Sequence, residues 1–94
     1  VELRLHEELH TVLGGDPPGY DDLPDLEYTR AVLRESMRLF PPVWAVSREA
    51  TRPIELADQA FTAKSVLMVS QYALNRHPRY WREPSRFDPA RFVG

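Results

Sequence analysis

Two groups of side chains in this sequence have the types and spacing that chemistry requires, and the first is HEELH, which runs from His6 to His10. Two histidines four residues apart share one face of a helix, where they can bind Zn²⁺, and Glu7 between them can activate a water molecule. Such a site needs a third ligand. The extended form of the motif has a glycine and a histidine at the positions that Leu13 and Asp16 occupy here. The extended motif thus supplies no third ligand here. A zinc hydrolase that uses His6, Glu7 and His10 is kept as one alternative.

The second group is a carboxylate and a guanidinium one helical turn apart, Glu35 and Arg38. On a helix, apolar residues surround them: Tyr28, Val32 and Leu39 in the arc of Glu35, and Leu26, Leu33, Met37 and Phe40 on the far side. This pattern predicts a helix buried on most of its circumference, with both charges carried inward. An unpaired buried carboxylate would cost roughly several kcal/mol, so Glu35 and Arg38 must then pair with each other and with a further group. The alternative is an exposed ion pair worth roughly a few tenths of a kcal/mol.

Two helices must position these side chains. Apolar residues recur every three or four positions over residues 2–13 and 26–40, which predicts amphipathic helices there. Asp25 is the expected N-cap of the second helix. Its expected end is Phe40, because Pro41 and the proline after it remove backbone donors.

After these prolines the apolar period changes from about 3.6 towards 2. Short strands are predicted within residues 43–70, where they form one small sheet, and a helical turn or two follows at Tyr72–Arg76. Residues 78–94 form an irregular meander punctuated by prolines. The predicted fold class is mainly α with a small β-sheet (α+β), and residues 1–94 form a single partial domain.

Composition limits the possible functions. The chain has 12 lysines and arginines, 14 acidic residues and no cysteine, and its net charge is -2. Disulfides, thiolate ligands and a cysteine nucleophile are therefore excluded within these residues, and the sparse basic residues predict no nucleic-acid partner. No run approaches 18 apolar residues, so no membrane-spanning helix is expected. The localisation is unknown from sequence, although the arginine-rich, lysine-poor composition would suit a soluble cytoplasmic protein of a bacterium.

The E-x-x-R pattern from Glu35 to Arg38 is followed, about fifty residues later, by FDPARF from Phe87 to Phe92. This ordered pair resembles the haem-thiolate cytochrome P-450 monooxygenases, and the likeness covers the whole chain from the end of the J helix, through the K helix, to the meander. In that family the arginine of the second motif, here Arg91, joins the glutamate and arginine of the first. The resemblance thus implies a structural triad of Glu35, Arg38 and Arg91 that fixes the scaffold beneath the haem and takes no part in acid-base catalysis.

The resemblance also assigns roles in the segment after the prolines. Arg48 stands where the family places an arginine against a propionate of haem b, and a solvent-facing strand residue is the alternative. Val43, Trp44, Ala45 and Val46 resemble the stretch that lines the substrate pocket, although Trp44 would also suit a core position. Ala63-Lys64-Ser65 departs from the family's proline, variable residue and glycine, Ala90 from a frequent glutamate, and His77 from a frequent aspartate.

The residues that would perform the chemistry are expected outside this chain. In the family, the cysteine that ligates the haem lies beyond the meander, hence after Gly94, and the I helix lies upstream of Val1. The chain is therefore expected to be a fragment that is inactive alone, with no catalytic residue and no metal ligand of its own.

The function implied for the full-length protein is insertion of one oxygen atom from O₂ into an apolar small molecule. Electrons would come from a ferredoxin or a flavoprotein reductase. Arg76, Arg79, Arg82 and Arg86 could form part of a basic docking surface for this donor, and a solvated meander is the alternative. Two competing hypotheses are a haem-thiolate lyase or isomerase, which needs no electron donor, and a noncatalytic interaction module.

Overall fold

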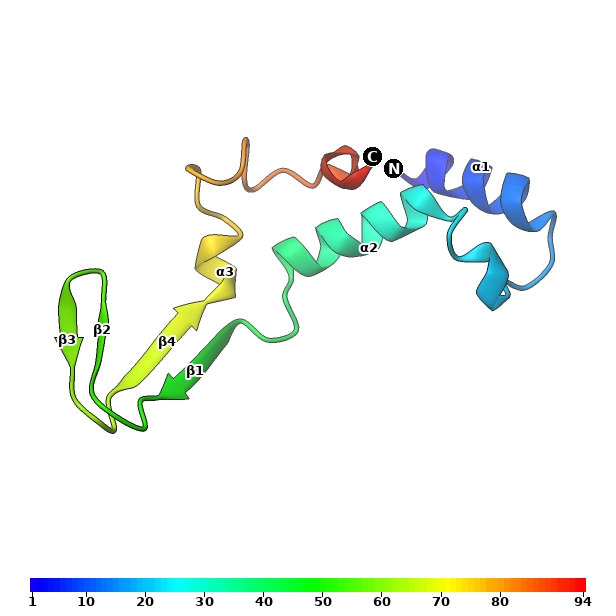
Figure 1. Cartoon of the computed structure of the whole chain (residues 1–94). Coiled ribbons are helices and arrows are strands. Elements are labelled where there is room, and N and C mark those ends of the chain that lie inside the picture. Colours follow the sequence, from blue (N-terminus) through cyan, green and yellow to red (C-terminus); the bar gives the residue numbers. More distant parts are fainter. The chain divides into compact units, whose positions relative to one another are not determined.

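The computed structural model describes all residues from Val1 to Gly94, and the chain divides into two compact units (Figure 1). The first, called the helical unit, comprises Val1–Phe40 and Ser85–Gly94. The second, called the strand unit, comprises Pro41–Pro84. The α+β class predicted from the sequence is confirmed. None of the helices combines the length and apolar character that a membrane-crossing segment needs.

The helical unit is built on α1 (Glu2–Leu13) and α2 (Glu27–Leu39), with the short 3₁₀ turn η1 (Tyr20–Asp22) between them. Both helices agree with the predicted ranges to within one residue at each end. α1 ends because Gly14 adopts a left-handed conformation (φ 60°), which lets its N–H donate to the His10 carbonyl at 3.0 Å. α2 ends at Leu39 with Phe40 as its C-cap, directly before the two prolines, as the missing proline donors predict.

The start of α2 differs from the prediction. Leu26, not Asp25, occupies the N-cap position, and no side chain at that position accepts a hydrogen bond from the first turn. The prediction that Asp25 caps the helix is therefore wrong. The first turn obtains its acceptor from α1: the carboxylate of Glu8, 20 residues before Tyr28 in the sequence, accepts the Tyr28 N–H.

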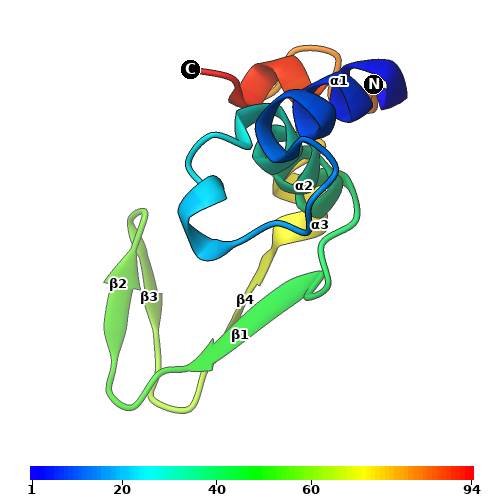
Figure 2. The ribbon, with the colours of Figure 1, turned by 90° about the vertical axis from the view of Figure 1, so that its right-hand side faces the viewer.

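α2 is buried on one side only. Tyr28, Ala31, Glu35 and Leu39 are buried, and α1 and η2 (Pro89–Phe92) pack against this side (Figure 2). On the other side Leu33 is 58% exposed, Met37 53% and Phe40 72%. The prediction of burial on most of the circumference is therefore wrong for this chain, because its residues supply packing partners for a single face.

The meander is irregular as predicted, apart from η2 near its end. Asp88 starts this turn: its Oδ1 accepts the Ala90 N–H at 3.2 Å, and Pro89 takes the first helical position, where a missing N–H costs nothing. Pro89 is also buried in the helical unit. The turn thus carries the second half of the FDPARF motif onto α2.

The strand unit contains two antiparallel ladders. β1 (Ala45–Glu49) pairs with β4 (Val66–Ser70), and β2 (Ile54–Leu56) pairs with β3 (Gln59–Phe61) (Figure 1). The prediction of one small sheet is therefore wrong, since the strands form two separate two-stranded sheets. α3 (Gln71–Leu74) follows β4 and supplies the predicted helical turn; it begins one residue earlier and ends two residues earlier than expected.

Local chemistry separates the two ladders. The first one closes at Ala50, whose N–H donates to Ser65 at 2.9 Å and whose carbonyl accepts from Lys64 at 2.7 Å. Pro53 then lacks the N–H that a continued ladder would need. The second ladder is a tight hairpin whose two loop residues, Ala57 (φ 48°) and Asp58 (φ 62°), adopt the positive φ values of a type I′ turn.

Candidate functional site

The candidate site is centred on Glu35, which is fully buried in the helical unit. Its neighbour on α2, Arg38, is only 3% exposed. The Arg38 Nε donates to Glu35 Oε2 at 2.6 Å, and Arg38 Nη2 donates to Glu35 Oε1 at 2.8 Å. Such a two-pronged contact between a guanidinium and a carboxylate is among the strongest side-chain pairings in proteins. The alternative of an exposed surface pair is thereby excluded.

The C-terminal segment of the helical unit completes this cluster. The Asp88 N–H donates to Glu35 Oε1 at 2.8 Å, and the Arg86 carbonyl accepts from Arg38 Nη2 at 3.1 Å. Arg91 lies in η2, and its Nε is 3.5 Å from Glu35 Oε1, an ion pair. The structure therefore brings together the three residues that the resemblance assigned to a triad, and adds two backbone groups. We call these three side chains the Glu35 cluster.

The surroundings of Glu35 keep it ionised. Burial alone would raise the pKa of Glu35, but the hydrogen bonds from Arg38 and from the Asp88 N–H, together with the charges of Arg38 and Arg91, outweigh it and lower the pKa below the ordinary value of 4.5. A carboxylate held in this form has no proton to donate. The cluster thus joins α2 to the C-terminal segment through an ionised carboxylate.

A second carboxylate, Glu8 of α1, has a role that the sequence did not reveal. Its Oε1 accepts the Tyr28 N–H at 2.6 Å, and its Oε2 accepts the Thr29 N–H at 2.8 Å and the Thr29 hydroxyl at 2.7 Å. Burial opposes ionisation, but these bonds and the charge of Arg4 outweigh it, so the pKa of Glu8 is lowered. No sequence signal marked this role, because Asp25 was the expected N-cap of α2 and only the structure places Leu26 at that position.

The HEELH sequence lies on α1, where His6, Glu7 and His10 are all exposed. No group of three or more His, Cys, Asp or Glu side chains is arranged to hold a metal ion anywhere in the chain. The third ligand that a zinc hydrolase requires is therefore missing from this structure. The geometry gives the zinc alternative no support.

The other predicted site residues belong to the strand unit, in and before β1. Val46 and Arg48 are two residues apart in β1, so their side chains leave the same face of the strand. Arg48 is exposed, and its Nη1 donates to the carbonyl of its own neighbour, Ser47, at 2.8 Å. Trp44 is 62% exposed and therefore occupies no core position in this unit, although its carbonyl accepts the Tyr72 N–H at 3.1 Å.

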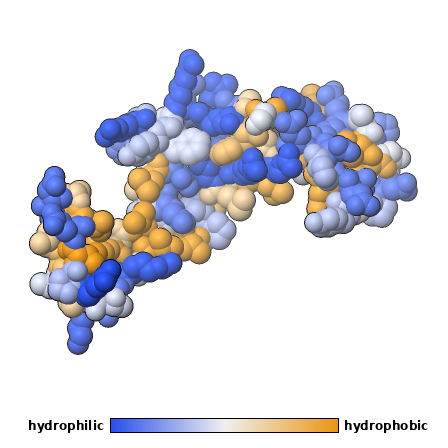
Figure 3. Space-filling model, viewed as in Figure 1, coloured by the Kyte–Doolittle hydropathy of each residue, from blue (hydrophilic) through white to orange (hydrophobic).

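Apolar side chains gather on the surface of the strand unit (Figure 3). The exposed ones are Val43, Trp44, Leu56, Val66, Met68, Val69, Tyr72, Leu74 and Tyr80. Four short strands cannot enclose both faces of their ladders, so this apolar surface is left open to solvent within the chain.

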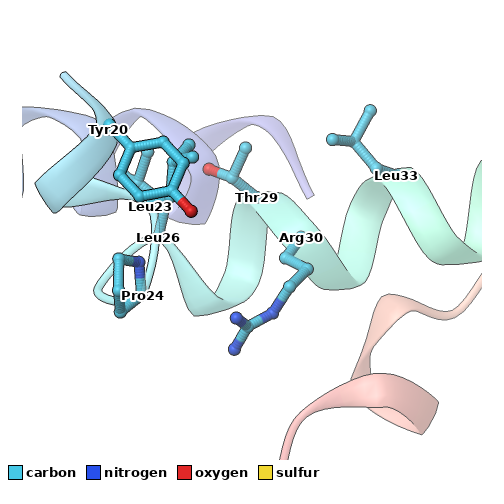
Figure 4. A pocket seen from close by; sticks show the side chains of 7 residues that line it. All are labelled: Tyr20, Leu23, Pro24, Leu26, Thr29, Arg30 and Leu33. Carbon is cyan, nitrogen blue, oxygen red and sulfur yellow. The ribbon is translucent and has the colours of Figure 1, made fainter. Parts of the chain in front are cut away.

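The helical unit carries an open apolar hollow of about 420 Å³ beside the first half of α2 (Figure 4). It is lined by Tyr20, Leu23, Pro24, Leu26, Thr29, Arg30 and Leu33. This lining contains no carboxylate and no histidine, and it includes no member of the Glu35 cluster. The hollow therefore adds no catalytic group to the candidate site.

Comparison with known proteins decides the family. The family model described as Cytochrome P450 matches residues 1–94, the whole chain. The chain belongs to the cytochrome P450 family. The resemblance based on the two motifs is thereby confirmed.

Relatives from bacteria and animals share this P450 region. Cyclooctat-9-en-7-ol 5-monooxygenase of Streptomyces melanosporofaciens is 42% identical over 94 residues, which is 100% of this chain and 20% of that protein. Pentalenene oxygenase of Streptomyces avermitilis is 37% identical over 93 residues, 99% of this chain and 21% of that protein. Taurochenodeoxycholic 6 alpha-hydroxylase of Sus scrofa is 38% identical over 92 residues, 96% of this chain and 18% of that protein. The chain spans about a fifth of the length of these curated relatives.

The arginines proposed as a docking surface differ in their surroundings within this P450 chain. Arg76 is half-buried, with its guanidinium carbon 3.8 Å from the centre of the Tyr72 ring, a cation–π contact. Arg79 and Arg82 are exposed in the strand unit, and Arg86 is exposed in the helical unit. Of the three docking candidates that lie in the strand unit, Arg79 and Arg82 present their charge more openly than Arg76.

Proposed function

We propose that this chain is the scaffold portion of a haem-thiolate monooxygenase that inserts one oxygen atom from O₂ into an apolar organic substrate. The observation that carries the proposal is the Glu35 cluster: a fully buried carboxylate that binds Arg38, the Asp88 N–H and Arg91 at once. The family match and the names of the relatives, a monooxygenase, an oxygenase and a hydroxylase, support the same activity. The role of the cluster is to hold the segment around Asp88 on α2.

The strand unit offers a group that fits a haem propionate. Arg48 is exposed, carries a permanent positive charge and forms no ion pair with a carboxylate of the chain. Its guanidinium can therefore take an external anion without first breaking an internal pair. In the proposal Arg48 holds a propionate of haem b, and haem bound through a cysteine thiolate supplies the activation of O₂. No cysteine occurs among these 94 residues.

The proposed substrate-binding residues are Val43, Trp44, Ala45 and Val46. Val43 and Trp44 are 53% and 62% exposed, so their apolar side chains are available to an apolar ligand. Val46 shares a face of β1 with Arg48, which would set substrate contacts and cofactor contacts on one strand face. The proposed partners are an apolar small molecule, O₂ and an electron donor, either a ferredoxin or a flavoprotein reductase, for which Arg79 and Arg82 offer positive charge.

Two measurements on the full-length protein test this function. We expect the reduced, CO-treated protein to give the absorbance spectrum of a haem-thiolate, and we expect NADPH with a suitable reductase system to drive O₂ consumption and oxygen incorporation into an apolar substrate. A haem-thiolate spectrum with substrate conversion that needs neither NADPH nor O₂ would replace the monooxygenase by a lyase or isomerase. A protein without haem would refute the proposal.

Replacing Arg48 should weaken haem retention. A hydrogen bond to a charged group contributes about 1.5–3 kcal/mol, so Arg48→Gln should raise the haem dissociation constant by about tenfold or more. Transfer of haem to apomyoglobin measures this change. Arg52→Gln is the matched control, because Arg52 is also exposed but lies past the end of β1. Equal haem loss from both variants would contradict a specific role for Arg48.

A further inference from the structure

The first turn of α2 depends on a side chain from another helix. The first N–H groups of any α-helix have no acceptor within the helix, and a polar side chain at the N-cap normally provides one. Leu26 occupies the N-cap of α2 and cannot do so. Glu8 of α1 does it instead, with one oxygen for the Tyr28 N–H and the other for the N–H and hydroxyl of Thr29.

We propose that Glu8 is a positioning residue for the haem site: by capping α2 from α1, it fixes the place of the helix that carries Glu35. This role rests on the proposed function, because it supposes that the Glu35 cluster supports a haem. Glu8 touches no member of that cluster. It acts through the backbone of α2.

The geometry of α2 links the cap to the cluster. Tyr28 and Glu35 are seven residues apart, which places them on the same face of the helix and about 10 Å apart along its axis. Both are buried, Tyr28 at 8% exposure and Glu35 at 0%. An α-helix transmits a displacement over two turns with little bending, so a shift of the first turn moves Glu35 relative to its partner, the Asp88 N–H.

The same turn is tied to the C-terminal segment. Glu27, the first residue of α2, accepts the Gly94 N–H on its Oε1 at 3.0 Å. The Arg4 guanidinium carbon lies 4.3 Å from the centre of the Tyr28 ring, which braces the turn against α1. Glu8 therefore acts at the point where α1 and the C-terminal segment both contact the first turn of α2.

No similar side chain can replace Glu8. Glutamine keeps one acceptor oxygen but turns the other atom into an amide donor, which would face a backbone N–H. Aspartate is shorter by one methylene, so its carboxylate would fall short of the two N–H groups at the start of α2. The neighbouring Glu7 is exposed, and its carboxylate makes no hydrogen bond or ion pair, so it provides the matched control.

The test compares Glu8→Gln, Glu7→Gln and Ile54→Ala in the full-length haem protein. Amide hydrogen exchange of the segment around Tyr28 reports on the cap, and the reduced-CO spectrum reports on the haem thiolate. In Glu8→Gln we expect exchange of the Tyr28 and Thr29 amides to speed up by about tenfold or more, and the fraction of haem with the thiolate spectrum to fall severalfold. Glu7→Gln should match the unmodified protein in both. Ile54→Ala should lower the melting temperature and leave the spectrum unchanged below it.

Each contrary outcome counts against the proposal. Faster exchange in Glu8→Gln with an unchanged spectrum would show that Glu8 caps α2 but does not position the haem site. Unchanged exchange would show that Glu8 does not stabilise the first turn of α2. Should Glu8→Gln fail to fold, Thr29→Val removes one of the three bonds and should shift both measurements in the same direction by less; no shift in either would overturn the role. A haem-free unmodified protein would refute the proposed function, whereas the exchange experiment would still report on the cap.

Discussion

Replacing Glu35 by glutamine in the full-length protein should abolish haem incorporation and lower the free energy of unfolding by about 3–5 kcal/mol. The substitution removes the charge that compensates Arg38, which is 3% exposed and cannot be hydrated without local unfolding. It also replaces one acceptor oxygen by an amide group that can only donate, although both oxygens of Glu35 now accept hydrogen bonds. The reduced-CO spectrum and urea unfolding measure the two effects.

Glu55→Gln is the control for this experiment. Glu55 is an exposed carboxylate on β2, so its neutralisation should change stability by at most about 0.5 kcal/mol. If Glu35→Gln proves too unstable to purify, Arg38→Lys keeps the positive charge but loses the two-pronged contact, and an intermediate loss is expected. A normal spectrum from Glu35→Gln would contradict the scaffold role of the cluster.

The Glu35 cluster could be predicted from the sequence only in part. The helical spacing placed Arg38 beside Glu35, and the cost of burying a charge required a further partner. The identity of that partner, Arg91, came from the family resemblance, since 53 residues separate Glu35 even from Asp88 in the same motif. The Asp88 N–H could not be predicted at all, because every residue except proline carries such a donor and no residue type marks the one that is used.

The remaining differences between the sequence-based predictions and the structure all concern contacts between separate helices and strands. The apolar period of α2 predicts which side chains prefer burial, but it does not supply the layer that would cover Leu33, Met37 and Phe40. Strand patterns likewise predict extended segments and not their partners, which is why two ladders replace the expected single sheet. The cap from Glu8 could not be predicted either, because an acidic residue on an amphipathic helix is usually solvated and its sequence position does not name a partner.

The helical unit and the strand unit carry residues with different proposed roles, so variants in the two units should fail in different ways. The helical unit holds the Glu35 cluster and the Glu8 cap, whose loss acts on the scaffold. The strand unit holds Arg48 and the apolar residues before it, whose loss should, under the proposed function, affect ligand binding. Glu35→Gln should thus lower stability and haem content together, whereas Arg48→Gln should weaken haem retention at nearly unchanged stability.

Stability of the full-length protein should fall in acid, and Glu35 should contribute to the fall. The pKa of Glu35 in the folded chain lies below its ordinary value of 4.5, so the unfolded chain binds more protons as the pH drops below that value. The stabilisation from Glu35 is therefore fully present above about pH 4.5 and is lost as the pH falls through the lower pKa of the folded state. The pKa of Glu8 is lowered too, so its contribution is lost in the same direction.

Urea unfolding at a series of pH values between neutrality and the acid limit measures this dependence. In Glu35→Gln the stability should be lower at neutral pH, and its further decline in acid should be shallower, because the group that takes up the proton is gone. Glu8→Gln should show the same change to a smaller extent, since Glu8 is only partly buried. If the free energy of unfolding of Glu35→Gln fell as steeply in acid as that of the unmodified protein, other carboxylates would govern the loss of stability. The ionised form of Glu35 would then contribute little to holding α2 against the segment around Asp88.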